Sequence, residues 1–177
     1  SAFAKNFIGD DKRHFGLEWQ ETQPVSQYLS YAAHVLMTDD VLFGAHPNWI
    51  DHRLRDADGI VLQDREITLK RFQKGQMAYR ETPIGGCVNV GDCELTPGSV
   101  LEVECLSNHC RNIVGSLSKL ERVIAAQTRR VNKLRLLDPQ SPECRNEESD
   151  LAIFVATRDN VLKDNARRCA DGQGNSH

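Results

Sequence analysis

The apolar positions of the N-terminal half recur at helical spacing and predict three helices. Between residues 25 and 43, apolar side chains return mostly at helical intervals, and Gly44 is a suitable end for that helix. A second helical pattern covers residues 62–74 and stops at Gly75, because glycine favours the position just after a helix. Between them, Pro47 suits the first turn of a short helix.

The stretches beside these helices have other patterns. Residues 1–24 mix glycine, charged residues and isolated aromatics without a period, and we expect an irregular arm there. Residues 76–81 alternate Met77 and Tyr79 with polar residues, which predicts a short strand. Ser1 follows no initiator Met and no leader pattern, so we expect a processed or truncated start.

The strongest periodic signal covers residues 98–137, which we interpret as one long helix. From Ile113 onward the apolar positions step by four and three in turn, as they do along the seam of a coiled coil. The predicted seam consists of Ile113, Leu117, Leu120, Ile124, Gln127, Val131 and Leu134.

The sequence D-P-Q-S-P at residues 138–142 ends this pattern and predicts a turn into a second helix. Ser141 suits the N-cap and Pro142 the first helical position of a helix that runs to about Cys169. A short connection makes two long helices antiparallel. The expected inward stripe of the second helix is Leu151, Val155, Arg158, Leu162, Asn165 and Cys169.

These elements predict a mainly α fold with two parts. Residues 1–97 form a small mixed α+β body that includes the start of a cysteine cluster, and residues 98–177 form an antiparallel helical hairpin with a disordered C-terminal tail. Folding the hairpin at its turn places Leu117 opposite Leu162 and Ile124 opposite Val155. No segment approaches the run of about 18 apolar residues that crosses a bilayer, so we expect a soluble chain without a membrane partner.

Four of the six cysteines lie in one turn-rich segment and suggest either a zinc site or disulfides. The expected zinc ligands are Cys87, Cys93, Cys105 and Cys110, with His109 or Cys169 as substitutes. The turns at Gly85–Gly86 and Gly91 would let the backbone approach a metal ion closely.

The alternatives to zinc are oxidised pairs or free thiols. The hairpin register sets Cys110 opposite Cys169, which suggests a disulfide across the hairpin base, whereas buried free thiols are common in protein cores. Reduced or zinc-bound cysteines indicate a cytoplasmic protein, and oxidised cysteines a periplasmic or exported one.

Positive charge is concentrated on the first hairpin helix although the chain carries a formal net charge of −3. Residues 111–137 hold five Arg and two Lys against one Glu, a local charge of +6. The second helix opens with Glu143, Glu147, Glu148 and Asp150, so pairing between the helices is one interpretation. The other is a ridge that binds the phosphates of a nucleic acid through Arg122, Arg129, Arg130, Lys133 and Arg135.

No sequence motif names a reaction, and we expect a protein that is not an enzyme. His34, His46, His52 and His109 are scattered, and none belongs to a metalloprotease or nucleophile motif. Asp39 and Asp40 are adjacent, and adjacent residues on a helix do not converge. We interpret all of these as solvated surface groups.

The motifs P-I-G-G-C, G-D-C and V-E-C-L-S-N-H-C are followed by a basic heptad helix and an acidic second helix. With this arrangement the chain resembles the C-terminal tails of tyrosine-recombinase integrases of mobile elements. The resemblance covers about residues 75–168. It implies association with DNA and with a larger recombination complex. The family's catalytic set does not carry over, because His34 is followed at the third position by Met37 in place of Arg, and neither Tyr28 nor Tyr31 has the context of the nucleophile.

The sequence therefore predicts a non-catalytic module that serves DNA-linked assembly in integration or recombination, with a structural zinc or cysteine cluster and a basic helix that contacts phosphates. The alternative is an exported, disulfide-stabilised domain whose hairpin binds another protein or acts as a sensor. The sequence sets no oligomeric state for either.

Overall fold

A computed structural model describes residues 22–44, 60–91, 93 and 103–173. The short helix expected after Pro47, the tail beyond residue 173 and residues 1–21 of the expected arm lie outside these described residues. The arm was expected to reach residue 24, but residues 22–24 already belong to a helix. Within them, no helix is both long enough and apolar enough to cross a membrane.

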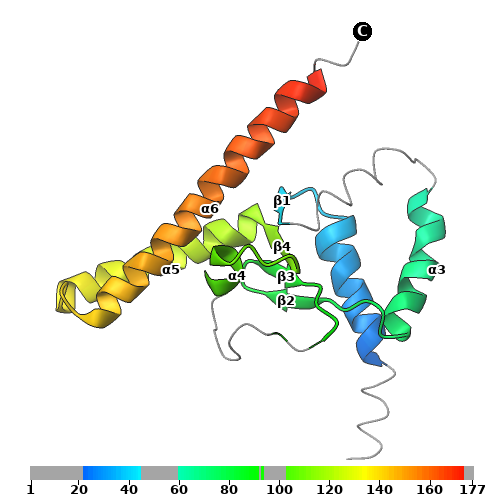
Figure 1. The fold of residues 1–177 in the computed structure, drawn as a ribbon, viewed down its shortest axis with the longest axis horizontal. Coiled ribbons are helices and arrows are strands. Elements are labelled where there is room, and N and C mark those ends of the chain that lie inside the picture. Colours follow the sequence, from blue (N-terminus) through cyan, green and yellow to red (C-terminus); the bar gives the residue numbers. More distant parts are fainter. Residues whose placement is uncertain (1–21, 45–59, 92, 94–102, 174–177) are drawn as a thin grey trace, which may run out of the picture.

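A four-stranded antiparallel sheet stands at the centre of the molecule (Figure 1). Its order is β1 (Leu42–Phe43), β4 (Ile113–Ser116), β3 (Gly85–Cys87) and β2 (Arg80–Thr82). Strand β4 pairs with both β1 and β3 and is buried along its whole length. The sheet therefore depends on a strand that comes late in the sequence.

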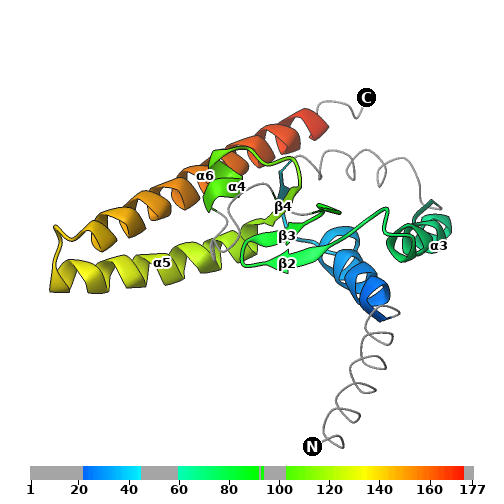
Figure 2. The ribbon, with the colours of Figure 1, turned by 60° about the horizontal axis from the view of Figure 1, so that its bottom comes forward.

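Each face of the sheet is covered by helices. Successive residues of a strand point to opposite faces, so one strand contributes side chains to both helical layers. Val114 of β4 belongs to a buried cluster with Tyr31, Val35, Phe72 and Tyr79 on the side of the N-terminal helices. Its neighbour Ile113 belongs to a second cluster, which contains Ile84, Leu120, Ile124 and Phe154. Figure 2 shows the N-terminal helices on one side of the sheet and the hairpin on the other.

Two N-terminal helices contribute Tyr31, Val35 and Phe72 to the first cluster. Residues 22–31 are α-helical and continue as the π-helical turn η1 (Ala32–Leu36), so the prediction for residues 25–43 is confirmed only for its first part. Residues 42–43 are the strand β1 instead, because the chain pairs there with β4. The predicted helix of residues 62–74 is confirmed as α3 (Ile60–Gln73).

Gly75 ends α3 as predicted. It has a φ of +67°, and its N–H donates to the carbonyl of Phe72 while the N–H of Gln76 donates to that of Arg71. These are the two hydrogen bonds of a Schellman turn, in which glycine relieves the strain of a positive φ. The strand predicted for residues 76–81 begins later, at Arg80, but Tyr79 is buried and Met77 packs against the first cluster.

Strands β3 and β4 contain glycines because neighbouring rings occupy the space that a side chain would need. A Cβ atom at Gly115 would overlap the ring of Phe43, and one at Gly86 would overlap the ring of Tyr79. The sequence predicts a turn around a metal ion at Gly85–Gly86. The structure instead places this pair in the buried strand β3.

The helical hairpin is present but shorter at its base than predicted. Helix α4 (Val103–Ser107) and strand β4 take the place of the first part of the expected long helix, and α5 (Leu117–Leu137) begins only after β4. Ile113 is consequently a sheet residue. The turn and the Ser141 cap are as predicted: the N–H of Cys144 donates to the Ser141 hydroxyl at 3.2 Å, and α6 spans Pro142–Gln173.

The predicted seam of α5 is confirmed from Leu120 to Val131, and the predicted stripe of α6 is wrong at its C-terminal end. Leu120, Ile124, Gln127 and Val131 are buried on α5 as expected. On α6 the buried residues are Cys144, Phe154 and Val161, whereas the predicted Leu162 and Cys169 are exposed. Leu151 and Val155 are partly buried against the second cluster.

Candidate nucleic-acid interface

The outward face of α5 carries a row of basic side chains. Arg122, Arg129 and Lys133 are exposed and follow one another at intervals of seven and four residues. They lie on the side of the helix opposite the buried Leu120, Ile124 and Val131. At 1.5 Å per residue this outward basic stripe is about 16 Å long. Among the described residues, no carboxylate forms an ion pair with any of the three.

The other two predicted phosphate ligands are already paired within the hairpin. An Nη2 atom of Arg130 lies 2.7 Å from Glu147, and Nε of Arg135 lies 2.6 Å from Glu148. Pairing between the helices is therefore confirmed for Arg130 and Arg135, whereas the outward basic stripe faces solvent and its binding of phosphates stays a prediction.

A polar layer reinforces this arrangement inside the seam. The side-chain amide of Gln127 is only 4% exposed and donates to the backbone carbonyl and the carboxylate of Glu147. A buried polar residue that can be satisfied in one pairing only favours that pairing over others. The same Glu147 carboxylate also pairs with Arg130, so the polar layer and this ion pair share one acceptor.

The N-terminus of α5 is held by a hydrogen-bonded group that joins three segments. Ser116 caps the helix, with its hydroxyl accepting from the N–H of Lys119. Asp40, from the loop before β1, accepts from the hydroxyls of Ser116 and Ser118 and from the backbone N–H of Ser118. A carboxylate at this end of a helix also opposes the positive end of the helix dipole.

The hydrogen bonds to Asp40 keep its carboxylate ionised. Partial burial raises the pKa of Asp40, but the donors Ser116, Ser118 and Val41 outweigh it and bring the pKa below its ordinary value of 3.8. The Asp40 carboxylate is therefore a stable acceptor at neutral pH, and the start of α5 depends on it.

A small cavity of about 160 Å³ opens beside this group. Glu81 of β2 contacts Nε2 of His34 and lies 3.8 Å from Nζ of Lys119, so it links the N-terminal helix, the sheet and α5. Burial, aided by Glu81 and Tyr31, raises the pKa of the Tyr79 phenol in the cavity wall to about 12. Every carboxylate here already has a hydrogen-bond or ion-pair partner, and the arrangement is that of a structural junction.

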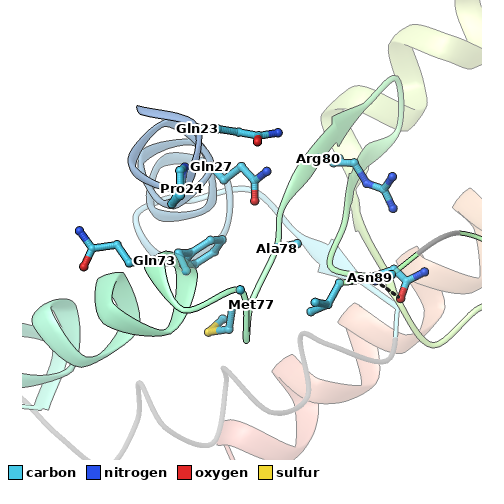
Figure 3. A pocket seen from close by; sticks show the side chains of 12 residues that line it. Gln23, Pro24, Gln27, Gln73, Met77, Ala78, Arg80 and Asn89 are labelled. Atoms are coloured by element: carbon cyan, nitrogen blue, oxygen red, sulfur yellow. Dashed lines mark hydrogen bonds between the residues drawn. The ribbon is translucent and has the colours of Figure 1, made fainter. Parts of the chain in front are cut away.

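A larger groove of about 540 Å³ lies between the N-terminal helix, the end of α3 and β2 (Figure 3). Its walls carry the amides of Gln23, Gln27, Gln73 and Asn89, together with Arg80. The side-chain amide oxygen of Gln27 accepts from the backbone N–H of Tyr79 at 3.4 Å and thereby joins the N-terminal helix to the chain before β2. Amide side chains donate and accept hydrogen bonds, but they supply no general acid, base or nucleophile.

The structure does not bring the four predicted zinc ligands into one group. Cys87 is in β3, Cys105 in α4 and Cys110 in the turn before β4, and all three are partly exposed, while Cys93 is exposed. Among the described residues, no group of three or more His, Cys, Asp or Glu is placed to hold a metal ion. Zinc binding stays a prediction.

The disulfide expected between Cys110 and Cys169 is not formed either. Both residues are free thiols, and Cys169 is exposed on α6 beyond Val161. The physical reason is that α5 starts only at Leu117, so Cys110 lies in the turn before β4 and not on a hairpin helix that faces Cys169.

Comparisons of the chain with protein-family models, curated proteins and solved structures found no match. The resemblance of residues 75–168 to integrase tails therefore stays a prediction.

Sequence reasoning missed the residues that hold the base of α5. Asp40 and His34 were interpreted as solvated surface groups, yet Asp40 binds the start of α5 and His34 binds Glu81. A signal for the cap was present, because serine is a preferred N-cap and Ser116 directly precedes an apolar helical run. The helical apolar pattern of residues 98–137 runs across Ser116 and conceals this cap.

Proposed function

We propose that this protein is a non-catalytic, DNA-associated module whose outward basic stripe, Arg122, Arg129 and Lys133, binds the phosphate backbone without reading base sequence. The observation that carries the proposal is the sorting of cations on α5: two arginines are paired with α6, and three cations face solvent together. Phosphate contacts of this kind position a protein on a duplex and carry no base information directly.

The geometry of the hairpin supports this function. The three cations project from a helix that is anchored along its seam and at its N-terminus, so the stripe is presented as a rigid row. A row of about 16 Å is long enough to meet several phosphates of one duplex, since successive charges lie about 1.7 Å apart along the axis of DNA. As in the integrase tails that residues 75–168 resemble, the module would serve assembly on DNA and leave the chemistry to a partner.

The test is a salt titration of DNA binding, measured by fluorescence anisotropy with the full chain and a labelled duplex of mixed sequence. If three cations displace counterions, the logarithm of the affinity falls with the logarithm of the salt concentration with a slope of about −2.7, or about 40-fold for a fourfold rise in salt. The triple variant Arg122→Gln, Arg129→Gln, Lys133→Gln is expected to lose both the affinity and the slope.

A matched control separates the stripe from overall charge. The variant Arg145→Gln, Lys163→Gln, Arg167→Gln removes the same number of exposed cations from α6 and is expected to retain the slope. Equal losses in the two triple variants would show that only net charge matters. Absence of binding by the unmodified chain at low salt would end the proposal.

A further inference from the structure

The C-terminus of α4 brings two cysteines together in a turn of known geometry. The N–H of Cys110 donates to the carbonyl of Cys105 at 2.9 Å, and the N–H of His109 donates to the carbonyl of Leu106 at 3.3 Å. His109 lies between them with a φ of +49°. These two bonds and the left-handed residue define a Schellman turn, with Cys105 at its first position and Cys110 at its last.

The first and last residues of such a turn are neighbours in space, and their side chains commonly contact each other. A disulfide requires Cα atoms about 4.4–6.8 Å apart. The backbone hydrogen bond from the N–H of Cys110 to the carbonyl of Cys105 draws the two backbones together across the turn. The fold therefore supplies the approach that a disulfide needs.

The surroundings of the two thiols suit reversible chemistry. Both are partly exposed, so a small reagent can reach them, and Cys105 also packs against the cluster of Ile84 and Phe154 that holds α4 in place. By contrast, Cys144 is fully buried in the hairpin. Burial and the Glu148 carboxylate raise the pKa of the Cys144 thiol, which disfavours its reactive thiolate.

We propose that Cys105 and Cys110 are a redox modification site, a dithiol that is oxidised to an intrachain disulfide by low-molecular-weight disulfides of the glutathione type. The thiolate of one cysteine attacks a sulfur of the reagent, which forms a mixed disulfide and releases one thiolate. The thiolate of the other cysteine then attacks the protein-bound sulfur and releases the second. The two cysteines are oxidised, the reagent is reduced to two thiols, and the protons of the cysteines pass to the released thiolates.

The sequence provides a direct readout for this pair. A protease that cleaves after glutamate cuts at Glu104 and Glu121, and the fragment 105–121 contains Cys105 and Cys110 and no other cysteine. Cys87 and Cys93 fall in a separate fragment that ends at Glu94. The full chain is equilibrated with mixtures of oxidised and reduced glutathione, free thiols are alkylated, and the fragments are weighed by mass spectrometry.

The expected result is a fragment 105–121 that lacks two hydrogens and carries no alkyl group. With Cys105→Ser or Cys110→Ser, the remaining thiol is expected to accumulate a stable glutathione adduct, because no second thiol resolves it. Cys93→Ser, which removes an exposed cysteine outside the pair, is expected to leave oxidation of the fragment unchanged. In denaturant the turn is lost, and the ratio of oxidised to reduced glutathione needed for half-oxidation is expected to rise about tenfold or more, because the effective concentration of the second thiol falls.

Three outcomes would overturn the proposal: glutathione adducts on both thiols of the unmodified chain without an internal disulfide, a dominant crosslink from this fragment to Cys87 or Cys93, or half-oxidation at the same glutathione ratio in folded and denatured chain. None of these depends on DNA binding, so the site and the proposed function stand or fall separately.

Discussion

At the scale of single residues, Asp40 shows how a side chain acquires its role from distant partners. It lies next to Asp39 in the sequence, yet only Asp40 binds Ser116 and Ser118 at the start of α5. The exposed Asp39 provides a natural comparison with the same charge in the same loop. The difference between the two is entirely one of placement.

Asp40→Asn is expected to lower the free energy of unfolding by about 1 kcal/mol at neutral pH, because hydrogen bonds to a charged acceptor are stronger than those to an amide and the site is partly screened by solvent. The folded-state pKa of Asp40 is below the ordinary 3.8 of the unfolded chain. Its contribution is therefore complete above that value and is lost as the pH falls through the lowered folded-state pKa.

Urea unfolding of the unmodified chain and of Asp40→Asn, repeated from neutral pH down to about pH 2, checks this prediction. The stability gap between the two should close in acid. Asp39→Asn should show no gap at any pH. A gap for Asp40→Asn that is constant over this range would mean that its charge is irrelevant.

At the scale of elements, the hairpin is defined by which face of α6 meets α5. The spacing of apolar residues predicted a stripe through Leu162, whereas the structure buries Val161 and leaves Leu162 44% exposed. Two neighbouring ridges of α6 both carry apolar side chains, so the pattern on one helix did not distinguish them. Contact with α5 selects the ridge that is buried, and the hydrogen bond from Gln127 of α5 to Glu147 of α6 is one such contact.

Val161→Ala and Leu162→Ala form a paired test of this register. Val161→Ala is expected to cost about 1–2 kcal/mol, because it removes buried methyl groups and leaves a small void. Leu162→Ala is expected to change stability by less than about 0.5 kcal/mol, as exposed positions usually do. Chemical denaturation measures both, and the reverse order would place Leu162 in the seam.

At the scale of the whole molecule, the predicted division into residues 1–97 and 98–177 is bridged by β4. This strand pairs with β1 and β3 from the first part and leads directly into α5. Val114 and Ile113 send their side chains into the two different clusters. The N-terminal helices and the hairpin are therefore expected to unfold as one unit.

Hydrogen exchange tests this coupling with Val35→Ala, a change in the first cluster only. Val35 is 2% exposed, and its truncation is expected to cost about 2 kcal/mol. If unfolding is cooperative, the most protected amides around Ile124 and Phe154 in the hairpin will exchange about 30-fold faster, since 1.4 kcal/mol is a factor of ten in an equilibrium constant. Unchanged exchange in the hairpin would show two independent units.

The sequence by itself determined those features that depend on neighbouring residues. The end of α3 at Gly75, the Ser141 cap, the turn between α5 and α6 and the seam of α5 all follow from local capping and from the period of a helix. The mainly α class with a small α+β body follows from the same signals.

Only the tertiary structure decided the features that depend on partners far along the chain. Residues 113–116 have a helical apolar pattern, but they form a strand because β1 and β3 offer backbone hydrogen bonds on both sides. Asp40 meets Ser116 across 76 positions, and the division of the α5 cations into paired and outward sets depends on where Glu147 and Glu148 lie. Such contacts have no local signature, because their free energy is gained only when the segments have already been brought together.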